Sequence, residues 1–184
     1  MTSAKLLTAG LLACLLAAGC AAPMGPDGVT SSEVQEFGVA PTSALRTVNF
    51  GGQTPTSIPG ARRVTTPEVA AALAASPPAI LIDVATGSGH SSLPGAAWLP
   101  RGGLGTSFDD ETQTRLVAAA ERLTGGDRRR PIITFCPNQN CWLSYNAALR
   151  LSRAGFTEVR WYRGGYMAWA EAGRPIARAV EASW

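Results

Sequence analysis

The pattern of apolar and polar positions is clearest between residues 131 and 173. Pro131–Phe135 is a short apolar run rich in β-formers, which predicts a buried strand. A helical spacing follows, with apolar residues on one side (Leu143, Ala147, Leu151, Ala154) and polar residues on the other (Asn146, Arg150, Arg153). Gly155 ends this predicted helix, and Val159–Tyr162 is a second predicted strand. The order of strand, cysteine loop, helix and strand predicts a unit of a parallel sheet.

Similar patterns predict further elements upstream and downstream. The additional strands are expected at Arg62–Val64, Ala79–Val84 and Ala96–Leu99. The additional helices are expected from a cap at Thr66 to about Ala75, from a cap at Ser107 or Asp109 to Gly125–Gly126, and over Tyr166–Ala172 with Met167 and Trp169 packed inward. We therefore expect one α/β domain over residues 61–178, with a central, mainly parallel sheet flanked by helices, and a tail over residues 179–184.

The beginning of the chain has the features of an export signal. Lys5 precedes the apolar run Leu6–Ala18, which is too short to span a bilayer and is followed by small residues up to Cys20. Residues 16–20, LAAGC, resemble a bacterial lipoprotein signal, in which Cys20 would become the lipidated first residue; ordinary signal cleavage nearby is the alternative. Residues 1–19 are thus predicted to be a signal peptide. The mature protein is expected in the periplasm, anchored to a bacterial membrane by the lipid.

Residues 20–60 are rich in Pro, Gly, Ser and Thr and show no sustained periodicity. This composition predicts a flexible tether, or else a disordered amino terminus without a role. Leu45–Phe50 is the one stretch in it that could pair as an edge strand.

Charge and cysteine content narrow the function classes. The net charge of +3 is mild, and no basic face interleaved with aromatic residues occurs, so we expect no nucleic-acid partner. If Cys14 leaves with the signal and Cys20 carries lipid, Cys136 and Cys141 remain as the two thiols. In an oxidising compartment such a pair is a disulfide candidate. With His90 as the single histidine the chain lacks four zinc ligands, and we expect no metal ion and no cofactor.

Several motifs together resemble rhodanese-like domains. That family carries C-x-x-G-x-R-S/T-x-x-A-A after a strand, then a helix ending in G-F/Y, then V-x-x-L-x-G-G-x-x-A-W-x-x-A-G-x-P. The residues that match in the same order are Cys136, Ala147-Ala148, Gly155-Phe156, Val159, Gly164-Gly165, Ala168-Trp169, Ala172-Gly173 and Pro175. Upstream, ILIDV over residues 80–84 and His90 followed by LPGA over residues 93–96 resemble two further family segments. The resemblance implies the family's three-layer α/β fold, with Asp83 and His90 in structural roles.

The cysteine loop departs from the family pattern. Cys136 lies eleven residues before Ala147, against nine in the family, and the loop arginine is missing. The string CWLSYNAA, which begins at Cys141, resembles a rhodanese-related subgroup named for a cysteine–cysteine–tryptophan motif. Members of that subgroup are associated with alcohol catabolism dependent on pyrroloquinoline quinone, so the resemblance implies a quinoprotein dehydrogenase system as a partner. The subgroup's name places two residues between the cysteines, and this chain has four.

Cys136 and Cys141 are the candidate catalytic residues. Cys136 follows a predicted strand and faces the amino end of the next helix, where the helix dipole favours a thiolate. It is therefore a candidate nucleophile, with an inert buried cysteine as the alternative. Cys141 could resolve a persulfide or disulfide on Cys136, or could form a permanent structural clip with it. Trp142 could cover the pair or belong to the core.

Candidate substrate-binding residues are less well defined. Asn138, Gln139 and Asn140 form the loop between the cysteines, which contains no cation for a thiosulfate dianion. Arg101 and Arg163 each lie beside a Gly-Gly pair and could reach the site from neighbouring loops, or could be ordinary surface arginines. The sequence predicts sulfur transfer or thiol–disulfide chemistry with a small sulfur compound or a thiol or disulfide partner protein. A non-catalytic module that binds a partner protein or a redox cofactor is the alternative.

Overall fold

The computed structural model describes residue 25 and residues 27–184, and its centre is a six-stranded sheet. The strands lie in the order β1-β6-β5-β2-β4-β8, and every neighbouring pair is parallel. The bounds of the first five along the chain are β1 Arg62–Val64, β2 Ile80–Asp83, β4 Ala97–Trp98, β5 Ile132–Phe135 and β6 Val159–Tyr162. The predicted parallel α/β fold is confirmed.

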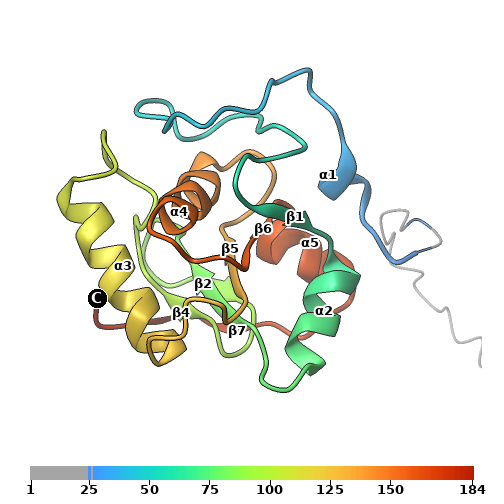
Figure 1. Cartoon of the computed structure of the whole chain (residues 1–184). Helices are drawn as coiled ribbons and strands as arrows, with labels where there is room; N and C mark the ends of the chain where they lie inside the picture. Colours follow the sequence, from blue (N-terminus) through green and yellow to red (C-terminus); the bar gives the residue numbers. More distant parts are fainter. Residues whose placement is uncertain (1–24, 26) are drawn as a thin grey trace, which may run out of the picture.

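Helices cover both faces of this sheet (Figure 1). Helices α3 (Glu111–Thr124) and α4 (Trp142–Arg153) share one apolar cluster, and α2 (Thr66–Ala74) and α5 (Gly165–Glu171) share a second. Strand β5 lies between β2 and β6, and all four of its residues are buried, which explains its continuous apolar sequence. Together the two helix layers and the sheet form the three layers that the family resemblance implied.

Two helix caps differ from the sequence prediction. Thr65, rather than Thr66, caps α2, in a capping box with Glu68. Asp110, rather than Ser107 or Asp109, caps α3 and accepts a hydrogen bond from the N–H of Gln113 at 2.8 Å. Several residues near each helix start are good caps, so the local sequence leaves the choice open and tertiary contacts decide it.

Of the three polar residues placed opposite the apolar side of α4, only Arg153 is exposed. Asn146 and Arg150, the other two residues, are both fully buried. The loop over residues 103–110 and the amino-terminal segment both cover this side of the helix and provide its polar partners. Met167, predicted to pack inward from α5, is instead 52% exposed.

Residues 27–60 lie against the domain and do not stand away from it as a tether would. Figure 1 shows this part of the chain, in blue to teal, running over α4, and it contains the short helix α1 (Ser31–Val34). Thr30, Glu33 and Thr54 are buried, and Ile58 belongs to the same apolar cluster as α4. The boundaries of the domain therefore extend further toward the amino terminus than the sequence pattern suggested.

The carboxyl-terminal residues also take part in the fold. Strand β7 (Ala177–Arg178) pairs antiparallel with β3 (Ser91–Ser92), and β8 (Val180–Glu181) extends the main sheet beside β4. Part of the predicted tail is thus an edge strand.

Candidate functional site

The two cysteines of the long loop are joined by a disulfide bond at the carboxyl end of β5. Cys136 directly follows the strand, and Cys141 occupies the cap position at the amino end of α4. Their Cα atoms are 6.4 Å apart. The predicted pairing is present. It lies at the carboxyl ends of the parallel strands, where open α/β folds hold their ligands.

The two sulfur-bearing residues differ in access to solvent. Cys136 is 1% exposed, whereas Cys141 is only partly buried. Cys141 also lines a cavity of about 210 Å³. The other lining residues are Phe50, Gly51, Thr86, Leu104, Pro137, Asn140 and Leu143. A molecule that enters this cavity meets Cys141 first, although the sequence pattern favoured Cys136 as the nucleophile.

A buried hydroxyl group lies next to the inner sulfur. The Oγ atom of Ser144 is 3.1 Å from Cys136 Sγ, and Ser144 is 1% exposed. The indole N–H of Trp161 donates a hydrogen bond to Ser144 Oγ at 3.0 Å. Because Trp161 uses an acceptor position of the hydroxyl, the hydroxyl hydrogen of Ser144 can point either at Cys136 or at the carbonyl oxygen of Cys141, which lies 3.4 Å away. Sequence reasoning named neither residue.

The start of α5 holds the beginning of the cysteine loop. The N–H of Tyr166 donates to Cys136 O at 3.3 Å, and the N–H of Met167 donates to Pro137 O at 3.0 Å. Gly165 has a φ of +63°, and a Cβ atom there would lie 1.8 Å from Cys136 O. The second glycine of the Gly-Gly pair is therefore required for this close approach.

Residues 50–54, termed here the covering segment, pair with the other half of the loop. The N–H of Gly52 donates to Asn140 O at 2.7 Å, and the N–H of Thr54 donates to Gln139 O at 3.1 Å. In return, the N–H of Trp142 donates to Phe50 O at 2.9 Å. The covering segment therefore forms one wall of the cavity beside Cys141.

The predicted substrate-binding residues of the loop have partners within the protein. The side chain of Asn138 accepts from the N–H of Asn140 at 2.9 Å and donates to Met167 Sδ at 3.2 Å. Gln139 offers its backbone carbonyl to Thr54, and Asn140 lines the cavity. Two of these three residues thus shape the loop, and Asn140 is the one that borders the space beside Cys141.

The two candidate arginines lie in different surroundings. Arg163 is 1% exposed, and its guanidinium donates to Thr54 Oγ1 at 3.1 Å and to Glu33 O at 3.1 Å. Burial, and then the nearby Arg63, lower the pKa of Arg163 to about 10. Arg163 therefore holds the covering segment in place and does not face the cavity beside Cys141. Arg101 is exposed and lines a second cavity.

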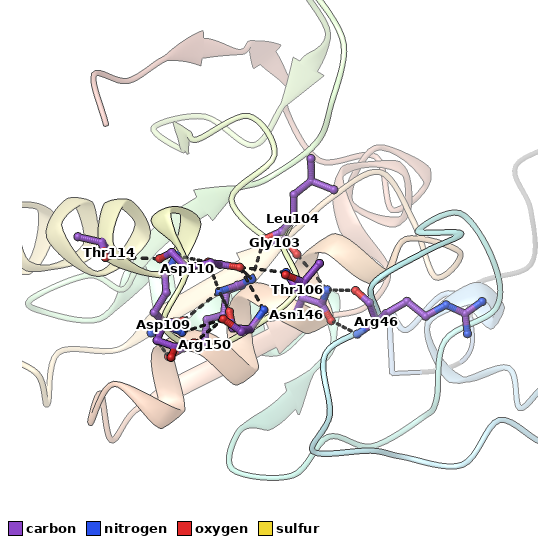
Figure 2. A network of polar contacts seen from close by, with 11 residues as sticks. Arg46, Gly103, Leu104, Thr106, Asp109, Asp110, Thr114, Asn146 and Arg150 are labelled. Carbon is purple, nitrogen blue, oxygen red and sulfur yellow. Dashed lines mark hydrogen bonds and ion pairs between the residues drawn. The ribbon is translucent and has the colours of Figure 1, made fainter.

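A polar network joins α4 to the segments beside it (Figure 2). Arg150 Nη1 and Nη2 each lie 2.9 Å from a carboxylate oxygen of Asp110. Burial alone would raise the pKa of Asp110, but hydrogen bonds from Arg150 and from the N–H groups of Gln113 and Ser107 lower this pKa to about 2. The side-chain amide of Asn146 donates to Arg46 O and Gly103 O, so α4 holds both segments that flank it.

Asp83 and His90 form a second cluster near α5. His90 Nε2 lies 2.7 Å from Asp83 Oδ2, and the Ser92 hydroxyl donates to the same oxygen at 2.6 Å. The imidazole ring also stacks on Tyr166. These contacts tie β2, β3 and α5 together, in keeping with the structural roles expected for Asp83 and His90.

Two general features bear on the class of site. Across residue 25 and residues 27–184, no three His, Cys, Asp or Glu side chains gather closely enough to hold a metal ion. Within the same part of the chain, no helix has both the length and the apolar character needed to cross a membrane.

A parallel sheet covered on both faces, with a cysteine loop after its central strand, defines a single-domain α/β protein with a thiol site. Residues 65–172 match the model of the rhodanese-like domain, and the chain belongs to this family. The family resemblance seen in the sequence is thereby confirmed.

Three solved structures illustrate the similarity, all at low sequence identity. A rhodanese-like domain from Anabaena is 21% identical, with 66% of this chain and 80% of that chain covered and a TM-score of 0.45. A polysulfide-sulfur transferase homodimer from Wolinella succinogenes is 20% identical, with 64% and 79% covered and a TM-score of 0.46. A human single-domain sulfurtransferase is 24% identical, with 61% and 96% covered and a TM-score of 0.41. Among curated proteins, none matches this chain.

Proposed function

We propose that this rhodanese-like protein carries out thiol–disulfide exchange through the Cys136–Cys141 bond, with Cys141 as the sulfur that is attacked. The main support is the difference in burial, because Cys141 borders a cavity and Cys136 is 1% exposed. A disulfide is attacked at the sulfur that an incoming thiolate can reach. This assignment reverses the order of the two cysteines that the sequence pattern favoured.

The exchange follows from the positions of the groups. An incoming thiolate forms a bond to Cys141 Sγ, the bond between Cys141 and Cys136 breaks, and its electron pair stays on Cys136 Sγ. The Ser144 hydroxyl, 3.1 Å away, can donate to the resulting thiolate, and the amino end of α4 adds a favourable dipole. A second thiolate then attacks the substrate sulfur of the mixed disulfide. The products are a substrate disulfide and the Cys141 thiolate, so two thiols are oxidised as one protein disulfide is reduced.

Of two other functions, sulfur transfer meets two obstacles and a binding module has one observation in its favour. Sulfur transfer through a persulfide on Cys136 requires the bridge to open first, and no cation occurs between the cysteines to bind thiosulfate. A non-catalytic binding module is favoured by the covering segment, because Gly52 and Thr54 already use backbone acceptors of the loop. The position of Cys141 beside the cavity favours exchange chemistry over both.

The reactivity of single-cysteine variants tests the proposal. In Cys136→Ser, the remaining Cys141 thiol should react quickly with a small aromatic disulfide, because it borders the cavity. In Cys141→Ser, the remaining Cys136 thiol should react about a hundredfold more slowly, since access limits attack. The intact bridge should open in a glutathione redox titration with an unchanged circular dichroism spectrum. Faster reaction at Cys136, or unfolding upon reduction, would contradict the proposal.

We also propose that the protein is exported to the periplasm and anchored there by lipid on Cys20. The support is the apolar run Leu6–Ala18 and the small residues before Cys20, which lie outside the described residues. The similarity of CWLSYNAA to the cysteine–cysteine–tryptophan subgroup supports a link to quinoprotein alcohol oxidation. A neighbouring gene for a quinoprotein dehydrogenase would strengthen this link. Deleting the gene for this protein should then abolish bacterial growth on an alcohol as carbon source, which tests the link.

A further inference from the structure

We infer that the site takes an acidic low-molecular-weight thiol, or its disulfide, and that Arg101 binds the carboxylate of this substrate. The inference rests on the proposed exchange at Cys141 and adds the substrate class. It is carried by a second cavity, which lies next to the one beside Cys141 and contains the cation that the cysteine loop lacks.

The two cavities adjoin at the carboxyl ends of β2 and β4. The larger has a volume of about 570 Å³, and Leu104 lines both. Thr86 lines the smaller cavity, and the next residue, Gly87, lines the larger. The remaining residues around the larger cavity are Ser88, Pro100, Arg101, Thr112, Arg115, Glu181 and Trp184. A molecule with its thiol at Cys141 would therefore have to pass Leu104 to reach the larger cavity.

The larger cavity contains one arginine that has no partner among its described neighbours. Arg101, Arg115, Glu181 and Trp184 all line this cavity. Arg115 is already engaged, because its guanidinium donates to Trp184 O at 2.8 Å and lies over the Trp184 ring. The guanidinium of Arg101 has no hydrogen bond or ion pair with any residue that the structure describes, so it is free to bind a ligand.

The backbone holds Arg101 in a conformation that an arginine seldom adopts. Its φ is +67°, in the left-handed region that costs a residue with a Cβ atom about 1 kcal/mol. The next two residues pack closely, since a Cβ atom on Gly103 would lie 1.9 Å from Leu143 O in α4. An arginine held in this way at a cavity is more than a solvated surface residue.

Helix α4 holds the turn that carries Arg101 through its contacts with Gly103 and Leu104, which Figure 2 shows. Leu104 N–H donates to Arg101 O at 2.8 Å, which closes the turn. From α4, Asn146 donates to Gly103 O at 2.9 Å, and Arg150 donates to Leu104 O at 2.7 Å. The helix that begins after Cys141 therefore also holds the backbone of the turn that carries Arg101.

A carboxylate is the anion that fits this arrangement. A guanidinium binds a carboxylate through two parallel hydrogen bonds, and the hydroxyl-bearing residues Ser88 and Thr112 line the same cavity. A molecule that reaches from Cys141 to Arg101 would have its thiol at one end and its carboxylate at the other. A small acidic peptide thiol has this chemistry.

Rates of bridge opening by thiols of different charge test the inference. The probes are glutathione, which is anionic, 2-mercaptoethanol, which is neutral, and cysteamine, which is cationic. Arg101→Asn tolerates the positive φ while removing the charge. It should slow opening by glutathione about two- to fivefold, the upper part of the range for an exposed charged pair, and leave the 2-mercaptoethanol rate unchanged. Arg101→Lys should retain part of the glutathione rate, and added salt should weaken the preference of the wild-type protein for glutathione.

Arg129→Gln is the matched control, because the Arg129 side chain is 85% exposed. It lies in the turn before β5, at the amino ends of the strands and away from the cysteines. The control variant should leave all three rates unchanged. Equal slowing of all thiols by Arg101→Asn, or an unchanged glutathione rate, would overturn the inference while the exchange function stands. If no thiol opens the wild-type bridge, the exchange function fails and the inference fails with it.

Discussion

At the scale of single residues, the contact between Ser144 and Cys136 favours Cys136 as the leaving sulfur and Cys141 as the sulfur that is attacked. Both residues are buried, and the Trp161 indole fixes the hydroxyl oxygen from the other side. Cys136 therefore leaves as a thiolate next to a hydrogen-bond donor, while Cys141 remains accessible. A donor that favours the leaving thiolate makes the bridge a stronger oxidant.

Ser144→Ala removes this donor and should raise the pKa of the Cys136 thiol in the reduced protein by about one unit or more. A hydrogen bond to a charged group contributes about 1.5–3 kcal/mol, and one pKa unit corresponds to about 1.4 kcal/mol. The measurement is thiolate absorbance against pH in Cys141→Ser, with and without the Ser144 change. Ser152→Ala, which removes another α4 hydroxyl that donates to Ala148 O, is the control. An unchanged pKa would limit Ser144 to packing.

At the scale of an element, the covering segment joins the cysteine loop to Arg163. Thr54 Oγ1 donates to Gln139 O at 2.6 Å and accepts from Arg163 Nε at 3.1 Å, and Thr54 is fully buried. One threonine thus links a buried cation to the loop that carries the disulfide. The segment's Phe50 and Gly51 line the cavity, so its position affects access to Cys141.

Thr54→Val should loosen the covering segment and increase the rate at which Cys141 reacts in the Cys136→Ser background. The change leaves the buried Arg163 Nε without its partner, which costs about 1–3 kcal/mol. Reaction with an aromatic disulfide and urea denaturation measure the two effects. Thr56→Val, at a partly buried threonine two residues after the segment, is the control. If Cys141 reacted no faster after the change, the covering segment would not control access to Cys141.

At the scale of the whole molecule, the packed amino-terminal segment limits how far the domain can stand from a membrane. Thr30 is already fully buried, although the sequence predicted a tether as far as residue 60. A lipid on Cys20 would leave about ten residues before Thr30, which span at most roughly 35 Å when extended. The proposed anchor would therefore hold the domain close to the bilayer.

Cys20→Ser should release the protein from the membrane fraction into the soluble periplasm, because the acyl chains that hold it would be missing. Cell fractionation and mass spectrometry of the mature amino terminus measure this result. The Cys141→Ser variant should remain with the membrane and serves as the control for cysteine loss. Recovery of cytoplasmic protein that retains Met1 would contradict both export and lipidation.

The sequence by itself determined the elements whose signals are local. The runs at Pro131–Phe135 and Val159–Tyr162 predicted strands, because residues buried on both faces of a parallel sheet must be apolar. The helix after Cys141 was predicted from its apolar spacing, and the disulfide from two cysteines left in an oxidising compartment. The family motif then gave the topology that joins these elements.

Only the tertiary structure decided how polar groups are used. Asn146 hydrogen-bonds Arg46, 100 residues away, and Arg163 bonds Glu33, 130 residues away, so no local pattern could predict that both side chains are buried. The accessible cysteine was likewise decided by distant segments, because the covering segment, the turn after β4 and the start of α4 together form the cavity at Cys141. Burial depends on what packs over a residue, and that packing comes from parts of the chain far away in sequence.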